Sequence, residues 1–235
     1  MLQPKVFTVK GIRVAFASIS IAETRFRATD TQKGLLHLRN DKDFKDLVIA
    51  FSRTQADFKI LSIHSGTEGQ VTLDAGQKAR YEYALQYGKI NLIIGHHPHV
   101  VRPIQKSGDQ FIFYSLGNYL MVGSANITQR LDPNMDWGMF SRLYLERDPV
   151  SGKVKIDAVE VIPLTNTHSR SAPLSVIPAS LRIQELNKLS ESQIGALSLL
   201  LQIDSISGRG VYCSNRLNSI RAKAMCAGKI LLPSY

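Results

Sequence analysis

The sequence predicts an α/β fold, and three observations lead to this class. A length of 235 residues suits one large domain, or one and a half, with a sizeable core. Hydrophobic residues make up 44% and charged residues 20% of the chain, which argues against long disorder, a fibrous repeat or a disulfide scaffold. Short apolar runs typical of strands alternate with segments of helical periodicity, as in a sheet covered by helices.

The first part of the chain predicts a β-hairpin followed by a helix. Two β-rich runs, 6–9 and 13–19, flank a Lys-Gly pair that is typical of a tight turn. The apolar run 14–22, preceded by basic residues, also loosely resembles a signal peptide, but a strand explains it better. Apolar residues at i, i+3, i+4 and i+7 behind Asp41 predict an amphipathic helix over about 42–55.

A strand, a loop, a helix and a second strand follow and predict a βαβ unit. The strands are 59–64 and 91–95, and between them lie a glycine-bearing loop at 65–72 and a helix at 74–87 closed by Gly88. Such crossovers make the two strands parallel, with a right-handed connection. We therefore expect the carboxyl ends of both strands at the same edge of the sheet.

More strands are predicted in the remainder of this body. Residues 111–116 form one strand before a Gly-Asn turn, and 140–147 with 153–162 form a hairpin. We expect the α/β body to be one domain spanning 1–165.

From residue 165 the composition changes, and we expect 166–235 to be a C-terminal helical extension with a tail. Leucines and isoleucines at helical spacing predict a long helix over about 179–202. Cys213 and Cys226 have no CxxC partner and no second pair, so neither a zinc knuckle nor a disulfide framework is indicated.

The chain carries an excess of positive charge. With 29 Lys and Arg against 19 Asp and Glu, the net charge is +10, which favours nucleic acid, anionic lipid or an acidic polymer as a partner. The basic residues are scattered, so a solvated basic surface is the simpler explanation, and no nucleic-acid-binding motif accompanies them. No apolar run approaches the roughly 18 to 20 residues of a membrane span.

Four histidines lie where the two parallel strands end, His64 after the first and His96, His97 and His99 after the second. Ligands of open α/β sheets gather at such strand ends. In an extended segment His97 and His99 face the same side, stiffened by the proline between them, whereas His96 points away. His64, His97 and His99 are therefore candidate ligands of a divalent metal or of phosphate. Glu68 could add an oxygen ligand or orient an imidazole.

Three ordered segments carry a resemblance to a known family. They are Ser-Ile-His-Ser-Gly-Thr-Glu at 62–68, Leu-Ile-Ile-Gly-His-His-Pro-His-Val-Val-Arg-Pro-Ile at 92–104 and Phe-Ile-Phe-Tyr-Ser-Leu-Gly-Asn-Tyr at 111–119. These segments resemble the CapA poly-γ-glutamate capsule biosynthesis family, within the calcineurin-like metallophosphoesterase superfamily.

The resemblance implies a fold, a metal site and a role. The fold would be the C-terminal part of a metallophosphoesterase-type four-layer α/β/β/α sandwich. His64, His97 and His99 would bind divalent Mn, Fe or Zn, while Glu68 and Asn118 would orient these ligands or line the substrate site. No catalytic residue is assigned. The implied activity is that of a metal-dependent hydrolase acting on a phosphoester, or of a protein that synthesises or anchors poly-γ-glutamate at the cell envelope.

One departure from the family is large. Its sheet begins with an N-terminal half that carries further metal-binding motifs, and none of these is found in this sequence. A two-metal site needs a bridging carboxylate. Asp30, Asp57 and Asp74 are available in principle, but Asp57 and Asp74 lie at helix ends, where a structural role explains them, and Asp30 lies in a loop that the sequence does not interpret. We therefore expect a truncated domain with an incomplete site. Its open sheet edge should make the chain less stable, aggregation-prone, or dependent on the missing half or on other capsule synthesis proteins.

Two functions follow as alternatives. The first is a CapA-like protein of capsule synthesis with a metallophosphoesterase-type metal site. The second is a non-catalytic binding or assembly component that holds an anionic cell-envelope polymer on its basic surface. Nucleic-acid binding is a third hypothesis, which no sequence motif supports. The resemblance places the chain at the cell envelope, and translation of the chain as it stands would place it in the cytoplasm.

Overall fold

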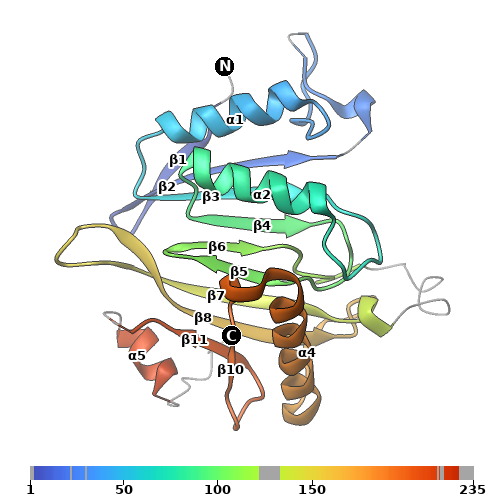
Figure 1. The fold of residues 1–235 in the computed structure, drawn as a ribbon, viewed down its shortest axis with the longest axis vertical. Helices are drawn as coiled ribbons and strands as arrows, with labels where there is room; N and C mark the ends of the chain where they lie inside the picture. Colours follow the sequence, from blue (N-terminus) through green and yellow to red (C-terminus); the bar gives the residue numbers. More distant parts are fainter. Residues whose placement is uncertain are drawn as a thin grey trace.

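The structure is a computed structural model, and it describes residues 3–21, 23–29, 31–121, 133–215, 217 and 220–227. It contains a six-stranded and a five-stranded sheet with helices packed outside them (Figure 1). The first sheet has the order β1-β2-β3-β4-β6-β5. Its strands are β1 (Lys5–Val9), β2 (Ile12–Ser20), β3 (Phe58–His64), β4 (Leu92–His96), β5 (Ile104–Ser107) and β6 (Gln110–Phe113).

The predicted hairpin and the predicted βαβ unit are both confirmed in the first sheet. β1 pairs with β2 in antiparallel fashion, and β3 pairs with β4 in parallel across the helix α2 (Ala75–Gly88). β2 also pairs in parallel with β3 across α1 (Asp41–Arg53), so two crossovers follow one another. β5, which the sequence did not predict, pairs with β6 at the far edge.

The ends of the two crossover helices follow ordinary capping chemistry. α1 begins after Asn40, whose side chain accepts hydrogen bonds from the backbone N–H groups of Lys42 and Asp43, so the cap lies one residue before the predicted one. α2 ends at Gly88, and Lys89 rather than the glycine adopts the left-handed conformation that follows the helix. Both helices therefore lie within a few residues of their predicted bounds.

The second sheet has the order β10-β11-β8-β7, with β9 paired to β8. The hairpin of β7 and β8 confirms the prediction for residues 140–162. The strands of this sheet are β7 (Gly138–Arg147), β8 (Val154–Thr165), β9 (Ala172–Pro173), β10 (Gln202–Ile203) and β11 (Gly210–Cys213).

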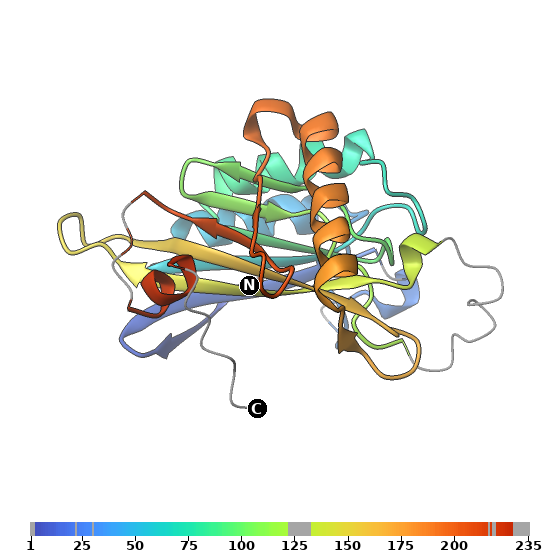
Figure 2. The same ribbon diagram turned by 90° about the horizontal axis from the view of Figure 1, so that it is seen from below.

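Two apolar layers hold the sheets and helices together. One lies between the first sheet and α1 with α2, and contains Phe51, Ile63 and Tyr81. The other lies between the two sheets, with Phe113 from the first and Val159 from the second, and it also receives apolar side chains of α4 (Val176–Ile194). A small cluster packs α5 (Ile220–Cys226) against the outer face of β8, as seen in Figure 2. The order helix, sheet, sheet, helix confirms the predicted α/β class.

The C-terminal part differs from the predicted long helix. α4 ends at Ile194, eight residues before the expected end, because Gly195 adopts a φ of +66° and turns the chain into the 3₁₀ helix η3 (Gly195–Leu197). The chain then adds β10 and β11 to the second sheet, so 166–235 is not helical throughout. The expected division at residue 165 stays a prediction. Two further 3₁₀ helices are η1 (Thr24–Phe26) and η2 (Pro133–Met135).

Cys213 and Cys226 form a disulfide. This corrects the sequence analysis, which found no indication of a disulfide framework. The Cα atoms are 6.1 Å apart, and the bond ties α5 to β11. Spacing alone did not reveal it, because the two cysteines, 13 residues apart, are brought together by the packing of α5 on the sheet.

The first sheet ends in an open edge at β1, where all five residues are exposed. They include Val6, Phe7 and Val9, each between 38% and 50% exposed. Such an edge is the feature on which the expected instability of the chain depends, and that expectation stays a prediction. Among the described residues, no helix is long and apolar enough to cross a membrane.

Candidate functional site

The structure brings the predicted histidines to one edge of the first sheet. β3 ends at His64 and β4 ends at His96, and these two residues are partners in the parallel register. Directly after β4 the chain turns sharply, with φ values of +98° at His97 and +58° at His99. The expectation of an extended segment here is wrong, because the backbone at both residues lies in the left-handed region.

The turn after β4 is held by the loop after β3. The backbone N–H of Gly69 donates to the carbonyl oxygen of Pro98 over 2.8 Å, and the N–H of Ser65 donates to the carbonyl of His96 over 2.9 Å. These bonds fold the chain at residues 97–99 back over the end of β3.

His64 and His97 form a close pair of imidazoles. Nε2 of His64 and Nδ1 of His97 are 3.1 Å apart, and the ring centroids are 4.8 Å apart. His99 lies farther off, with its centroid 6.2 Å from that of His97. Two ring nitrogens at this separation either share a proton in a hydrogen bond or face a common cation as adjacent ligands.

The partners of His99 define which of its nitrogens is available. Asn118 donates from Nδ2 to the carbonyl oxygen of Met135 over 2.8 Å, which leaves its Oδ1 as the acceptor facing His99. Nδ1 of His99 lies 2.7 Å from this oxygen and must carry the proton that it donates. The lone pair of neutral His99 is therefore on Nε2, the atom that a ligand would meet. Asn118 thus lies beside an imidazole, and its role in a functional site stays a prediction.

Burial lowers the pKa of three of these histidines, His64, His96 and His97. For His64 the burial is reinforced by the neighbouring His97, and for His97 by His99, while the carboxylate of Glu68 opposes the shift at His97. Burial alone lowers the pKa of His96. These imidazoles are accordingly neutral at pH 7, the form that has a free lone pair for a cation.

Arg102 is a functional candidate that the sequence analysis did not single out. Its side chain is fully buried, and it donates to the carbonyl oxygens of Gln70 and Thr67 and to the side chains of Asp74 and Gln77. It thereby fixes the loop between β3 and α2, which carries Glu68. A basic residue between two valines and a proline was the signal in the sequence, since arginine is almost never fully buried unless it is paired.

Of the three aspartates considered in the sequence, Asp57 and Asp74 serve structural roles, and Asp30 lies outside the described residues. Asp57 accepts hydrogen bonds from the backbone of Arg13 and from the side chain of Arg147. Asp74 precedes α2 and binds Thr67 and Arg102. Within the part of the chain that the structure describes, no group of three or more His, Cys, Asp or Glu side chains is arranged to hold a metal ion. The site is thus a pair of imidazoles with a third one nearby.

The fold and this edge define a class of protein, a two-sheet α/β protein with histidines gathered where two parallel strands end. The model of the bacterial capsule synthesis protein PGA_cap family matches residues 2–122, which is half of the chain. The chain belongs to this family.

Two curated relatives are capsule biosynthesis proteins. The PGA biosynthesis protein CapA of Bacillus subtilis (strain 168) is 28% identical over 113 residues, which cover 48% of this chain and 29% of that protein. The capsule biosynthesis protein CapA of Bacillus anthracis is 31% identical over 115 residues, which cover 48% of this chain and 28% of that protein. The chain thus matches less than a third of the length of either relative.

Solved structures with some similarity include two proteins at 13% identity. A phosphatase from Mycoplasma pneumoniae has a TM-score of 0.40, with 71% of this chain and 58% of that chain covered. GAP50, the anchor in the inner membrane complex of Plasmodium, has a TM-score of 0.36, with 98% of this chain and 62% of that chain covered.

Proposed function

We propose that the chain acts in synthesis of a poly-γ-glutamate capsule and binds a divalent metal ion through His64 and His97. The observation that carries the metal site is the 3.1 Å separation of Nε2 of His64 and Nδ1 of His97. Metal–nitrogen bonds of about 2.0 to 2.1 Å place adjacent ligand nitrogens roughly 3 Å apart, so these two atoms fit one ion.

The surroundings of the pair support this proposal. Nε2 of His99 is the unprotonated nitrogen of that ring, because Asn118 accepts the proton of Nδ1. Glu68 is exposed on the adjacent loop, where it can supply an oxygen ligand or orient a ring. A bound Mn, Fe or Zn ion would polarise an oxygen of a phosphoryl or carboxylate group.

The proposed substrate class is anionic. The PGA biosynthesis protein CapA of Bacillus subtilis suggests poly-γ-glutamate, whose carboxylates suit both a cation at the histidine edge and a chain of net charge +10. Phosphoesters are the other anionic class that such a site would take. Because two curated relatives are capsule biosynthesis proteins, we propose that this chain cooperates with other capsule synthesis proteins at the cell envelope.

The metal content of the purified 235-residue chain tests the proposal. Elemental mass spectrometry after gel filtration should find near-stoichiometric metal in the wild type and little in a His97→Ala/His99→Ala variant. Arg25→Ala, at a side chain that is 69% exposed and distant in sequence from the histidines, is the control and should keep its metal. Metal-free wild-type protein after incubation with Mn²⁺, Fe²⁺ and Zn²⁺ would refute the metal site.

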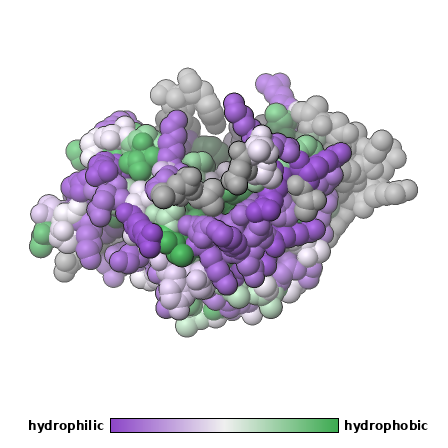
Figure 3. Space-filling view, turned by 90° about the horizontal axis from the view of Figure 1, so that it is seen from above, coloured by the Kyte–Doolittle hydropathy of each residue, from purple (hydrophilic) through white to green (hydrophobic). Residues whose placement is uncertain are grey.

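A second candidate function is a non-catalytic component that binds an anionic polymer. The observation that favours it is the net charge of +10, spread over a surface on which hydrophilic residues predominate in the view of Figure 3. Polymer binding that weakens steeply with salt and survives His97→Ala would support this function. Polymer binding that requires both the histidine and a metal ion would support the first.

A further inference from the structure

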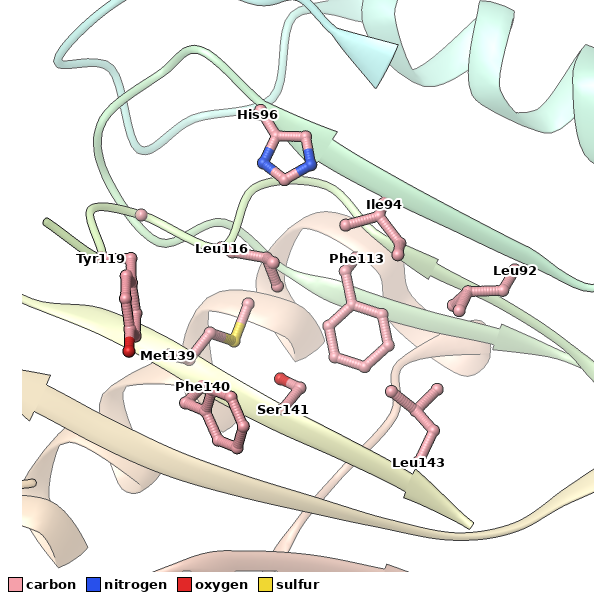
Figure 4. Close-up of a pocket in the computed structure, with 11 residues that line it drawn as sticks. Leu92, Ile94, His96, Phe113, Leu116, Tyr119, Met139, Phe140, Ser141 and Leu143 are labelled. Carbon is pink, nitrogen blue, oxygen red and sulfur yellow. The ribbon is translucent and has the colours of Figure 1, made fainter. Parts of the chain in front are cut away.

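A cavity of about 280 Å³ lies between the two sheets, beside the histidine edge (Figure 4). Its walls come from β4, from β6 with the turn that follows it, and from β7. The lining residues that decide its chemistry are Ile94, His96, Leu116, Met139, Ser141 and Leu143.

Most of the lining is aliphatic or aromatic, and among the described residues no lysine, arginine, aspartate or glutamate contributes to it. Two polar groups face each other across this apolar space in Figure 4, the imidazole of His96 from β4 and the hydroxyl of Ser141 from β7. An apolar cavity with a few convergent polar groups is the usual form of a site for a small organic ligand.

The hydroxyl of Ser141 is the second observation. Its oxygen is buried and has no hydrogen-bond partner within the described parts of the chain. Buried hydroxyl groups in folded proteins are nearly always paired, because an unpaired one costs free energy. A molecule in the cavity can provide the missing partner.

The position of the cavity connects it to the candidate site. His96 and His64 are direct partners on β4 and β3, so their side chains lie on the same face of the first sheet. His64 in turn contacts His97. The His96 end of the cavity therefore adjoins the imidazole pair, and a molecule that enters it leaves its polar end close to that pair.

We propose that this cavity binds the alkyl chain of an amphiphilic molecule whose oxygen-bearing head hydrogen-bonds to Ser141 and His96. An alkyl chain matches the leucine, isoleucine and methionine walls, because burial of apolar surface is favourable only against apolar partners. The site is independent of the proposed metal ion, since His96 and Ser141 belong to the cavity and not to the ligand set.

Methyl NMR of the full chain, labelled with ¹³C at the methionine methyl groups, tests this proposal with 1-octanol as the probe. Because Met139 lines the cavity, its methyl signal should shift and saturate with 1-octanol, whereas ethanol, which has the same head without the chain, should cause no saturable shift. Ser141→Ala keeps the cavity but removes the hydroxyl, and should weaken binding of 1-octanol about fivefold. Ser141→Phe should fill the cavity and abolish binding. Leu181→Ala, at an exposed position of α4, should leave binding unchanged.

Three results would overturn the proposal. One is a Met139 signal that does not move up to the solubility limit of 1-octanol. Another is unchanged affinity in Ser141→Ala, which keeps the test valid if Ser141→Phe does not fold. The last is a Met139 shift that depends on protein concentration without any probe, which would assign the cavity to a second copy of the chain. Loss of metal from the histidine variants would affect none of these readouts.

Discussion

Arg102→Leu is expected to destabilise the fold strongly, because the guanidinium is fully buried and holds four acceptors. Two of these are the backbone carbonyls of Thr67 and Gln70, and the others are side chains of Asp74 and Gln77. Removing one partner of a buried ion pair costs about 3 to 5 kcal/mol. The side chain of Asp74 is 30% exposed and regains some hydration, so we expect about 3 kcal/mol, the lower end of that range.

Urea unfolding of the wild type, Arg102→Leu and Arg102→Lys measures this effect. The lysine variant keeps the charge but not the planar fork, and should recover only part of the loss. The matched control is Arg80→Leu, since Arg80 is 41% exposed and lies 3.8 Å from Asp41, a kind of pair that contributes about 0 to 1 kcal/mol. A loss below about 1 kcal/mol in Arg102→Leu would refute the view that this arginine fixes the loop carrying Glu68.

Four further predictions concern other parts of the molecule. Asn118→Leu should remove the acceptor that fixes the tautomer of His99, so ¹⁵N NMR of metal-free protein should find a mixture of the Nδ1–H and Nε2–H tautomers where the wild type has the Nδ1–H tautomer; an unchanged tautomer would contradict the assignment. Gly95→Ala should prevent stable folding, because a Cβ there would lie 2.1 Å from a backbone carbonyl oxygen, whereas Gly76→Ala, with open space in α2, should stabilise the chain by about 0.5 to 1 kcal/mol; equal melting temperatures would contradict this. Reduction of the disulfide opens the loop that joins two cysteines 13 residues apart, and should lower the free energy of unfolding by roughly 2 to 3 kcal/mol; it should also lower the hydrogen-exchange protection of α5, and unchanged unfolding in dithiothreitol would count against this. The backbone N–H of Arg13 and the side chain of Arg147 lower the pKa of Asp57 from its ordinary value of 3.8, so this carboxyl binds fewer protons in the folded than in the unfolded state. Its contribution to the free energy of unfolding is therefore present above pH 3.8 and is lost as the pH falls through the folded pKa, and acid unfolding of Asp57→Asn should lack that part of the pH dependence.

The fold was predictable where local pattern and packing agree. The helix behind Asn40 has its apolar residues on one stripe, and Phe44, Leu47, Val48 and Phe51 are all buried as the spacing predicted. The same holds for β3 and β4, which are apolar runs between turns. β10 and β11 were missed because strands of two and four residues carry too little periodicity to stand out, and they exist through pairing with β8 and with each other.

The location of the site at the strand ends was predictable from the sequence, but the contacts between its side chains were not. Strand ends brought His64 close to the later histidines, yet the contact of His97 with His64 depends on a left-handed turn that bulky residues seldom adopt. The role of Asn118 follows from a bond to Met135, 17 residues away, which no spacing rule contains. Ser141 had no distinguishing signal, because only the second sheet brings it opposite His96.

At His97 and His99, backbone stability and site chemistry favour different residues. Each of these side chains occupies a conformation that costs an L-residue of order 1 kcal/mol or more, and that glycine would adopt freely. Folding alone would favour glycine at both positions, while any chemistry at the strand ends requires imidazoles there. The rigidity of the surrounding loop, anchored by Arg102, is what allows the histidines to persist against that preference. Loss of selection for the site should therefore appear first as glycine at these two positions.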